Sequence, residues 1–278
     1  MKVSKLKEQT VPKIFTQNEF KEIIIKITNK SDFNFVIENE LHKNESDLFW
    51  KITNEFNDTK KPLAYILENK YFYNSDFYVN ENVLIPRPET ELIVEEVLKL
   101  NLDEKNLFDV CCGSGCIGIS IKNINDSVNL YLSDISPKAL EVTKINLDKH
   151  KIKGQLICSD YLEVFKKVNV KPDVITINPP YIDIEDQNVG ESVRNYEPHI
   201  ALFAENNGLI FYEKLFNDLD FLYNLNKELT IFCEFGFSQK EELEKLFSPL
   251  IVKYNIDFKK DYANNWRMFV ITSKESHG

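Results

Sequence analysis

Apolar residues recur at helical spacing in the first sixty residues of the chain. A helix capped by Asn18 places the apolar residues of segment 20–27 on one face, and a helix capped by Ser46 places those of 49–56 inward. Pro62 suits the first turn of a further short helix, because its fixed φ is helical and its missing N–H is not needed there. The pattern therefore predicts a small helical domain.

Two aromatic runs follow these predicted helices. They cover residues 70–73 and 76–79 and flank Asn74-Ser75, a pair of turn-forming residues, so we expect a β-hairpin. Two roles are open for the aromatic side chains: they pack the hairpin against a core, or they form a surface that binds a protein partner.

From about residue 100 the pattern changes to short apolar runs that alternate with amphipathic segments. Ser136 and Pro137 give a clear helix start between two of the runs. Strands are expected at 107–111, 129–133, 156–158, 173–177, 229–235, 250–258 and 267–272, and helices at 115–122, 137–150, 208–225 and 238–247. Strands separated by helices of this length form parallel βαβ units with right-handed crossovers, which predicts an α/β fold.

The change of pattern divides the chain into two expected domains. Residues 1–85 form a helical domain with a hairpin linker, and residues 86–278 form the α/β domain. The stretch 182–207 is long for a connection and shows little pattern. We therefore expect it to be a functional lid or a disordered segment.

Charge and composition narrow the classes of function. Lys and Arg number 34 and Asp and Glu 44, so the net charge of −10 argues against broad electrostatic binding to DNA or RNA, although a local basic groove is compatible with it. No apolar run reaches the roughly 18 residues of a membrane span, and residues 1–15 lack the apolar stretch of a secretory signal. The same residues contain Glu8 and no Arg, which disfavours a mitochondrial presequence. We expect a cytoplasmic protein without membrane contact.

The cysteines do not follow the pattern of a disulfide framework. Their number is odd and three of them fall in one turn: Cys111, Cys112, Cys116, Cys158 and Cys233. A structural zinc site needs about four ligands, usually in paired spacing, and no second pair lies near a histidine. Small buried residues in a tight turn explain these cysteines better, and no metal site is expected.

A glycine-rich turn, Asp109-Val-Cys-Cys-Gly-Ser-Gly115, lies between a predicted strand and a predicted helix. Glycines there let the backbone approach a ligand, and the N–H groups of the helix start face it. Asp134 is the next acidic residue that ends a strand, and a carboxylate at that place can accept hydrogen bonds from both hydroxyls of a ribose. Together these features favour a nucleoside cofactor. No G-x-x-x-x-G-K-[ST] run is present, so an ATP-binding P-loop is not expected.

A second turn, Asn178-Pro179-Pro180-Tyr181, follows the apolar strand that ends near residue 177. Two prolines fix φ and remove backbone donors, so the turn is stiff. It offers the Asn178 side-chain oxygen and the Pro179 carbonyl as acceptors beside the Tyr181 ring. A planar NH2 group has two N–H donors in one plane, and this turn therefore suits an amide or amino group held against an aromatic face.

Several blocks of the chain resemble a known family. Residues 178–181 are similar to the N-P-P-Y motif of S-adenosylmethionine-dependent methyltransferases that act on amino or amide nitrogen. Further blocks resemble those of the release factor glutamine N5-methyltransferases (the HemK/PrmC type). These blocks are Pro62-Leu-Ala-Tyr-Ile-Leu67, Val83-Leu-Ile-Pro-Arg-Pro-Glu-Thr-Glu91, Asp109–Ser120, Asp134-Ile-Ser136, Glu197–Leu202 with Gly208-Leu209, and Glu234-Phe-Gly236. The likeness spans roughly residues 60–270, and I-P-R-P-E-T-E together with N-P-P-Y is its most specific part.

The resemblance implies a seven-stranded, Rossmann-like methyltransferase fold with a small N-terminal helical domain that recognises the substrate. It implies S-adenosyl-L-methionine as cofactor and a peptide-chain release factor as partner, methylated on the glutamine of its Gly-Gly-Gln tripeptide. By position in the motifs, cofactor contacts are implied for Cys111, Cys112, Gly113, Ser114, Gly115, Asp134, Tyr161 and Asn178. Substrate contacts are implied for Asn178, Pro179, Pro180 and Tyr181, with catalytic roles for Asn178, Pro179 and Tyr181.

The chain departs from the family pattern at Cys111 and keeps it in kind at Tyr161. The family usually has Gly where this chain has Cys111, so a Cβ and a sulfur enter space that the backbone normally leaves open. It usually has an aromatic residue, often Trp, at the position of Tyr161, which keeps the aromatic face. The segment 87–91 fits both a helix start and the lining of a site.

Two other functions remain as alternatives. An adenine N6-methyltransferase on DNA or RNA also uses N-P-P-Y, but it needs a cationic groove, against which the net charge argues. A non-catalytic binding protein would keep the fold and lose cofactor affinity through Cys111.

Overall fold

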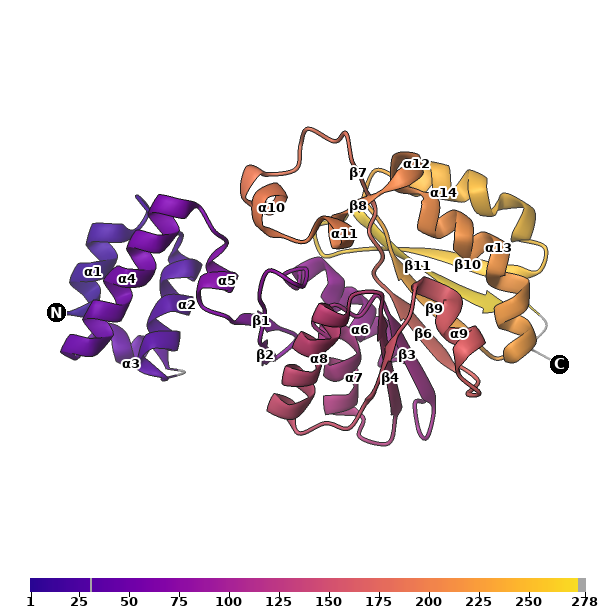
Figure 1. Cartoon of the computed structure of the whole chain (residues 1–278), viewed down its shortest axis with the longest axis horizontal. Coiled ribbons are helices and arrows are strands. Elements are labelled where there is room, and N and C mark those ends of the chain that lie inside the picture. Colours follow the sequence, from indigo (N-terminus) through magenta and orange to yellow (C-terminus); the bar gives the residue numbers. More distant parts are fainter. Residues whose placement is uncertain (31, 275–278) are drawn as a thin grey trace. The chain divides into compact units, whose positions relative to one another are not determined.

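The computed structural model describes residues 1–30 and 32–274, which form two compact units (Figure 1). The first unit contains Met1–Asn69 and Gly190–Tyr196. The second contains Lys70–Val189 and the chain from Glu197 onward.

The first unit is helical. Its helices are α1 (Val3–Thr10), α2 (Gln17–Thr28), α3 (Phe33–Ile37), α4 (Lys43–Thr59), α5 (Leu63–Ile66) and α10 (Glu191–Tyr196). The predicted apolar faces of α2 and α4 meet in its core, where Phe20 and Phe49 lie with ring centroids 5.8 Å apart. The Tyr196 hydroxyl donates to the Thr59 carbonyl oxygen at 2.7 Å, which ties α10 to the end of α4.

Both predicted helix caps in this unit are wrong. The cap of α2 is Thr16, whose hydroxyl accepts from the Glu19 N–H at 3.2 Å while the Glu19 carboxylate accepts from the Thr16 N–H at 2.7 Å. The cap of α4 is His42, whose N–H donates to a glutamate three residues later at 2.7 Å. A glutamate three residues after the cap completes a capping box, and this reciprocal pairing favours these positions over Asn18 and Ser46.

The second unit is built on a seven-stranded sheet in the order β10-β11-β9-β6-β3-β4-β5, which confirms the predicted fold class. The strands are β3 (Asn106–Val110), β4 (Asn129–Asp134), β5 (Gln155–Cys158), β6 (Val174–Ile177), β9 (Thr230–Glu234), β10 (Tyr254–Lys260) and β11 (Trp266–Ser273). All neighbouring pairs are parallel except β10 with β11 and β11 with β9. The chain reverses its direction of travel across the sheet between β3 and β6, where a crevice is expected at the carboxyl ends of the strands.

The remaining elements of this unit connect or cover the sheet (Figure 1). They are β1 (Lys70–Phe72), β2 (Ser75–Phe77), η1 (Pro88–Thr90), α6 (Glu91–Val97), α7 (Cys116–Ile124), α8 (Pro137–His150), η2 (Tyr161–Glu163), α9 (Val164–Lys167), β7 (Ile182–Asp183), α11 (His199–Leu202), β8 (Phe203–Ala204), α12 (Glu205–Gly208), α13 (Ile210–Leu225), α14 (Lys240–Phe247) and η3 (Ser248–Leu250). Within residues 1–30 and 32–274, no helix combines the length and the apolar character that crossing a membrane requires.

Successive residues of the central strands enter two separate apolar cores. In β3, Leu107 packs in the core shared with α6, α7 and α8, whereas Phe108 packs in the core shared with α9, α13 and α14. In β4, Leu130 and Tyr131 alternate in the same way. This period of two, with both faces covered, is what a buried parallel sheet requires.

The predicted hairpin forms and belongs to the second unit. Phe72 of β1 and Phe77 of β2 are buried in the core of α6, α7 and α8. The Asn146 side chain of α8 accepts from the Tyr78 N–H at 2.7 Å and donates to the Tyr78 carbonyl at 3.0 Å. These contacts place the division between the units at Asn69, whereas the sequence pattern placed it near residue 85.

The stretch 182–207 is not disordered, so that alternative is wrong, and the functional lid stays a prediction. It contains β7 and β8, which pair in parallel, and the short helices α10 and α11. Glu197 in its middle is only 3% exposed and accepts from the Ile85 N–H at 3.1 Å. The sequence did not show these elements because they are too short to give a periodic signal.

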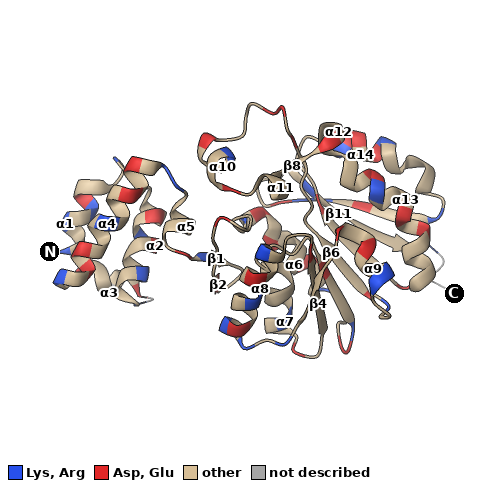
Figure 2. Ribbon diagram, in the orientation of Figure 1, with Lys and Arg blue, Asp and Glu red and all other residues tan. Residues whose placement is uncertain are grey.

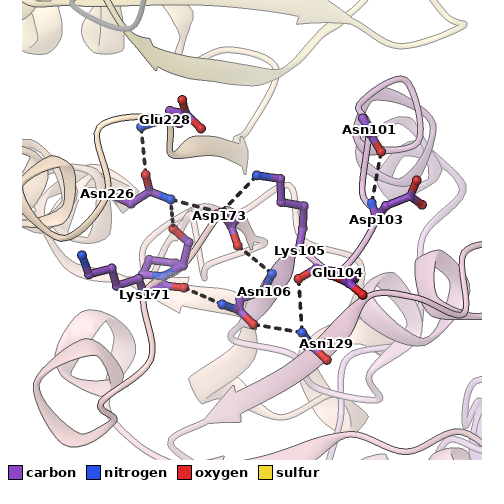
Figure 3. A network of polar contacts seen from close by, with 11 residues as sticks. Asn101, Asp103, Glu104, Lys105, Asn106, Asn129, Lys171, Asp173, Asn226 and Glu228 are labelled. Atoms are coloured by element: carbon purple, nitrogen blue, oxygen red, sulfur yellow. Dashed lines mark hydrogen bonds and ion pairs between the residues drawn. The ribbon is translucent and has the colours of Figure 1, made fainter.

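A polar network joins the amino ends of the central strands (Figure 3). The Asp173 carboxylate accepts from the Asn106 N–H at 2.8 Å, from Lys105 Nζ at 3.4 Å and from Asn226 Nδ2 at 3.2 Å. Asn106 in turn donates to the Lys171 carbonyl at 3.0 Å. The loops before β3, β6 and β9 are therefore held together by paired groups.

Candidate active site

A cleft opens at the carboxyl ends of β3, β4, β5 and β6, at the reversal point of the sheet. It encloses about 930 Å³ including its mouth, within the range of small-molecule sites. Its lining residues from these strand ends are Cys111, Cys112, Gly113, Ser114, Asp134, Ile135, Ser136, Asp160, Tyr161, Asn178 and Pro180. The two motifs that sequence analysis singled out therefore border one cavity.

The glycine-rich turn follows β3 in a left-handed conformation. Cys111, Gly113 and Gly115 have φ of 58°, 55° and 78°. A Cβ at Gly115 would lie 2.7 Å from Thr143 Cγ2, so glycine is needed there for space as well as for φ. The left-handed region costs a residue with a Cβ, such as Cys111, about 1 kcal/mol. Cys111 nevertheless adopts it and lines the cleft.

Helix α8 holds the turn from behind. The Thr143 hydroxyl donates to the Gly113 carbonyl at 2.7 Å, and Asn146 Nδ2 donates to the Ser114 carbonyl at 2.9 Å. At the start of the turn, Asp109 is 1% exposed and accepts from the Gly118 N–H and the Thr176 hydroxyl, at 3.0 and 2.9 Å. Burial raises the pKa of Asp109 to about 7. Asp109 thus fixes the helix start and does not border the cleft.

Asp134 lies at the end of β4 and faces the cleft. Its Oδ2 accepts from the Gly113 N–H at 2.9 Å and its Oδ1 from the Ser136 N–H at 2.9 Å. Burial raises the pKa of this carboxyl, while these backbone N–H groups oppose the shift. Since a carboxylate has about four acceptor positions, acceptor capacity remains for a ligand.

Tyr161 follows β5 and forms an aromatic wall of the cleft. It is 4% exposed, has φ of 42° and packs edge-on against Phe211 with ring centroids 5.1 Å apart. Its hydroxyl is buried and makes no hydrogen bond to any described residue. The ring, and not the enclosed hydroxyl, is therefore the surface that Tyr161 offers to a ligand.

The Asn178 side chain is held by one end of its amide. Its Nδ2 donates to Thr90 Oγ1 at 3.3 Å. Within residues 1–30 and 32–274, no group donates to Asn178 Oδ1 or to the Pro179 carbonyl. The turn therefore keeps two free acceptor oxygens, as its sequence predicted.

Tyr181 is fixed at three points. Its hydroxyl donates to Glu234 Oε1 at 3.1 Å, and its carbonyl accepts from Gln239 Nε2 at 3.0 Å. Gly208 packs so closely that a Cβ there would lie 2.1 Å from the same carbonyl oxygen. Burial, then the charge of Glu234, raises the pKa of Tyr181, so its hydroxyl stays protonated.

An ion pair borders the mouth of the cleft. The Arg87 guanidinium donates to Glu197, whose carboxylate is almost fully buried. Arg87 and Thr90 line the cleft, whereas Glu91 lies outside the lining and accepts from the Tyr73 N–H at 3.0 Å. The segment 87–91 therefore both lines the site and starts a helix, the two roles that its sequence predicted as alternatives.

The structure separates the predicted site residues into two groups. Eight of them line the cleft: Cys111, Cys112, Gly113, Ser114, Asp134, Tyr161, Asn178 and Pro180. Gly115, Pro179 and Tyr181 lie outside the lining, although each is part of a turn that borders it. Sequence analysis gave no role to Glu234 and Gln239, which contact Tyr181. The Glu234-Phe-Gly236 block was the signal for them.

The cysteines do not form a ligand set. Among the described residues, no group of three or more His, Cys, Asp and Glu side chains is placed to hold a metal ion. Burial raises the pKa values of Cys111, Cys112 and Cys116, the last to about 12. The thiols of the turn are therefore protonated at neutral pH.

Comparison with known proteins gives consistent similarities. Residues 88–194 match the family described as Methyltransferase small domain. The release factor glutamine methyltransferase of Mycoplasma mycoides is 42% identical over 90% of this chain and 90% of its own length, and that of Leptospira interrogans is 51% identical over 52% and 53%. The solved hMettl16 catalytic domain, in complex with the MAT2A 3′UTR hairpin 1, has a TM-score of 0.58 at 14% identity and covers 100% of this chain and 92% of its own. This last likeness concerns the fold alone.

Proposed function

The chain belongs to the family of release factor glutamine methyltransferases, and on that premise we propose that it methylates the side-chain amide nitrogen of a glutamine in a peptide-chain release factor. The expected acceptor is the glutamine of the Gly-Gly-Gln tripeptide. The observation that carries the proposal is Asn178, whose amide nitrogen is engaged by Thr90 while its oxygen is free at the cleft.

The methyl donor is S-adenosylmethionine, and the cleft has groups that fit it. The acceptor capacity left on Asp134 would hold the ribose hydroxyls, and the ring of Tyr161 would contact the nucleoside. The turn 111–115 would approach the cofactor closely, with Gly113 having no atom within 4 Å of an added Cβ. When bound, the cofactor supplies a methyl group on a sulfonium, which is already a good electrophile.

The contribution of the protein is to orient the amide. An amide nitrogen is a weak nucleophile because its lone pair is delocalised into the carbonyl. Asn178 Oδ1 and the Pro179 carbonyl would accept the two N–H bonds and fix the plane of the NH2 group, while Tyr181 would pack on its face. Orientation of this kind can contribute on the order of 7–11 kcal/mol to lowering a barrier.

We assign no side chain of the cleft as a general base. The described lining contains no histidine, its buried thiols have raised pKa values, and Asp134 already accepts from two N–H groups. We propose that the surplus proton leaves to water. The protein then needs no paired acid and base, only a fixed amide plane.

The partner follows from the same reasoning. A release factor is a large protein substrate, so surface beyond the cleft is needed to recognise it. We propose that the first unit, with its helices α1 to α5, recognises the substrate. We propose a cytoplasmic location, where translation termination takes place.

A nucleic-acid methyltransferase is the nearest alternative. The chain has a net charge of −10, and Figure 2 shows Lys and Arg interspersed with Asp and Glu along the helices of both units. Nucleic-acid binding depends on cationic surface that neutralises phosphates. The charge pattern therefore favours a protein substrate.

Mass spectrometry of the products tests the proposal. The protein is incubated with labelled S-adenosylmethionine and, in separate reactions, a bacterial release factor, the same factor with its Gly-Gly-Gln glutamine replaced by alanine, and duplex or single-stranded nucleic acid. We expect one added methyl on the glutamine of the first substrate only. Methylated adenine with an unmodified release factor would support the nucleic-acid enzyme. Retained partner binding without cofactor binding would support a non-catalytic protein.

A further inference from the structure

A buried acid lies behind the Asn178–Tyr181 turn and has no role in the chemistry described so far. Glu234 ends β9 and is 1% exposed. Strands β9 and β6 are neighbours in register, with Cys233 opposite Ile177, so Glu234 is placed directly beside the start of the turn. Burying a carboxyl is costly unless the group is paired, and this position therefore calls for an explanation.

Glu234 is bonded to the far end of the turn. Its Oε1 accepts from the Tyr181 hydroxyl at 3.1 Å. Its Oε2 is buried and makes no hydrogen bond that meets normal geometry with any described residue. Burial raises the pKa of Glu234 to about 7, while Thr90, Arg267 and Tyr181 favour its charged form.

Thr90 connects the acid to the near end of the turn. It is 2% exposed, lies at the end of η1, and its Oγ1 accepts from Asn178 Nδ2 at 3.3 Å. A hydroxyl has one proton and two lone pairs, so accepting from Asn178 leaves its proton for an acceptor on the other side. Glu234 is the acceptor expected for this proton, since the Thr90 hydroxyl stabilises the charged form of its carboxyl.

This arrangement decides which way the Asn178 amide points. The two ends of an asparagine amide have nearly the same shape and opposite hydrogen-bonding character. An acceptor at Thr90 selects the orientation that directs Nδ2 to Thr90 and leaves Oδ1 for the cleft. With the reverse orientation, the turn would present a donor to an incoming NH2 group, and the two would repel.

We propose that Thr90 and Glu234 are a positioning pair for methyl transfer: Thr90 holds Asn178 with its oxygen toward the cleft, and Glu234 holds Tyr181 and favours the Thr90 orientation that accepts from Asn178. The inference rests on the function proposed above. Neither residue contacts the reacting atoms, so both act through the turn. The end of η1 and the end of β9, which are far apart in sequence, thus both support the turn of residues 178–181.

Four variants test the pair by steady-state kinetics on the release factor. Thr90→Val keeps the shape and removes the acceptor, so kcat should fall at least tenfold while KM for S-adenosylmethionine stays within threefold. Thr90→Ser keeps the hydroxyl and should restore kcat to within threefold of wild type. Glu234→Gln should lower kcat about threefold to tenfold. The double variant Thr90→Val/Glu234→Gln should lose less than the product of the two single losses, because part of the Glu234 effect acts through Thr90 and Asn178 and only the rest through Tyr181.

The control is Tyr223→Phe, which removes a buried hydroxyl without a described hydrogen-bond partner on α13, away from the cleft. It should keep the wild-type kcat. Thermal melts show whether each variant is folded. If Thr90→Val does not fold, Thr90→Ser and Glu234→Gln still decide the matter, since a loss equal in both would point to a general structural role and overturn the pairing.

A second measurement does not depend on turnover. The Asn178 side-chain NH2 signals, assigned in ¹⁵N–¹H spectra by their absence in Asn178→Ala, should be distinct in wild type and shifted or averaged in Thr90→Val. If they are unchanged, the positioning role is excluded. If wild type leaves the release factor unmethylated while these signals depend on Thr90, the proposed function fails and the positioning role stands. If wild type and Thr90→Val methylate it at equal rates, the reverse holds.

Discussion

The two ends of the parallel strands use polar groups in opposite ways. At the amino ends, Asp173, Asn106 and Asn226 bond to one another and to loop backbone (Figure 3). At the carboxyl ends, acceptor capacity is left over in residues that line the cleft: Asn178 Oδ1 accepts from no described group, and Asp134 keeps acceptor capacity beside its backbone partners. The polar groups named at the amino edge thus bond within the protein, whereas those named at the carboxyl edge keep acceptor capacity at the cleft.

Unused capacity of this kind is informative because it is costly. A buried donor or acceptor without a partner costs about 1–3 kcal/mol, so folding alone gives no reason to keep several at one edge. Left-handed backbone at Cys111 and Tyr161 adds to that cost. We therefore expect a ligand to supply the missing hydrogen bonds at the carboxyl edge, whereas the groups of the network at the amino edge bond to one another.

The largest expected effect distinguishes two asparagines, one at each edge. Asn178→Ala should lower kcat about a hundredfold or more with little change in melting temperature, because it removes an acceptor and misplaces the substrate amide. Asn226→Ala should leave kcat unchanged and lower stability by about 1–3 kcal/mol, since Asn226 bonds to the Pro172 carbonyl, Asp173 and the Glu228 N–H. Kinetics and urea unfolding of both variants provide the check. A large loss of kcat in Asn226→Ala would break the comparison.

A tenfold to hundredfold effect is expected on cofactor binding at Asp134. Asp134→Ala removes the acceptor proposed for the ribose and releases the Gly113 N–H, so calorimetry with S-adenosylmethionine should show Kd raised about 10- to 100-fold. The matched variant at the other edge is Asp173→Ala, which should lower the melting temperature and leave Kd unchanged. Equal cofactor affinity in wild type and Asp134→Ala would remove this residue from the ribose site.

The buried acids of the carboxyl half should make stability depend on pH. The pKa of Glu234 is raised by burial from an ordinary value of 4.5 to about 7, so the folded state retains a proton that the unfolded chain has lost. Stability therefore falls as pH rises from about 4.5 to 7, by on the order of 1–3 kcal/mol. Glu234→Gln lacks this loss, and its free energy of unfolding relative to wild type should increase between pH 5 and pH 8. Tyr223→Phe is the control, with a difference that should not change over this range.

Sequence patterns predicted the regular parts of this molecule well. The βαβ alternation gave the sheet, and Ser136 with Pro137 gave the start of α8, because start signals and apolar periods are local properties. The order within the segment 182–207 could not be predicted, since its elements are too short to give a period and a buried acid such as Glu197 leaves no apolar signal. The sequence pattern placed the division between the units near residue 85, whereas the structure places it after Asn69. The hairpin belongs to the second unit through tertiary contacts, which the local pattern does not report.

The site was predictable only as far as it is contiguous in sequence. Asn178 and Asp134 belong to short motifs, so their place at the cleft could be expected. Thr90 and Glu234 meet the same turn from distant segments, and no local pattern reports which residues meet behind a turn. Predicting such supporting residues requires the register between β6 and β9.

The smallest expected effect concerns Cys111 and tests whether strain at the carboxyl edge serves binding. In Cys111→Gly, relief of a left-handed backbone gains about 1 kcal/mol, and the greater freedom of glycine in the unfolded chain offsets roughly 0.4–1 kcal/mol of that. Stability should thus change little, while S-adenosylmethionine should bind up to about threefold tighter because the sulfur leaves the cleft lining. Cys111→Ala keeps both the Cβ and the strain, and should show less gain. Glu104 has φ of 57° in an exposed loop at the amino edge, so Glu104→Gly relieves comparable strain and should leave Kd unchanged. Weaker binding by Cys111→Gly than by Cys111→Ala would mean that the left-handed cysteine preorganises the turn for the cofactor, and that strain at this edge is part of the site.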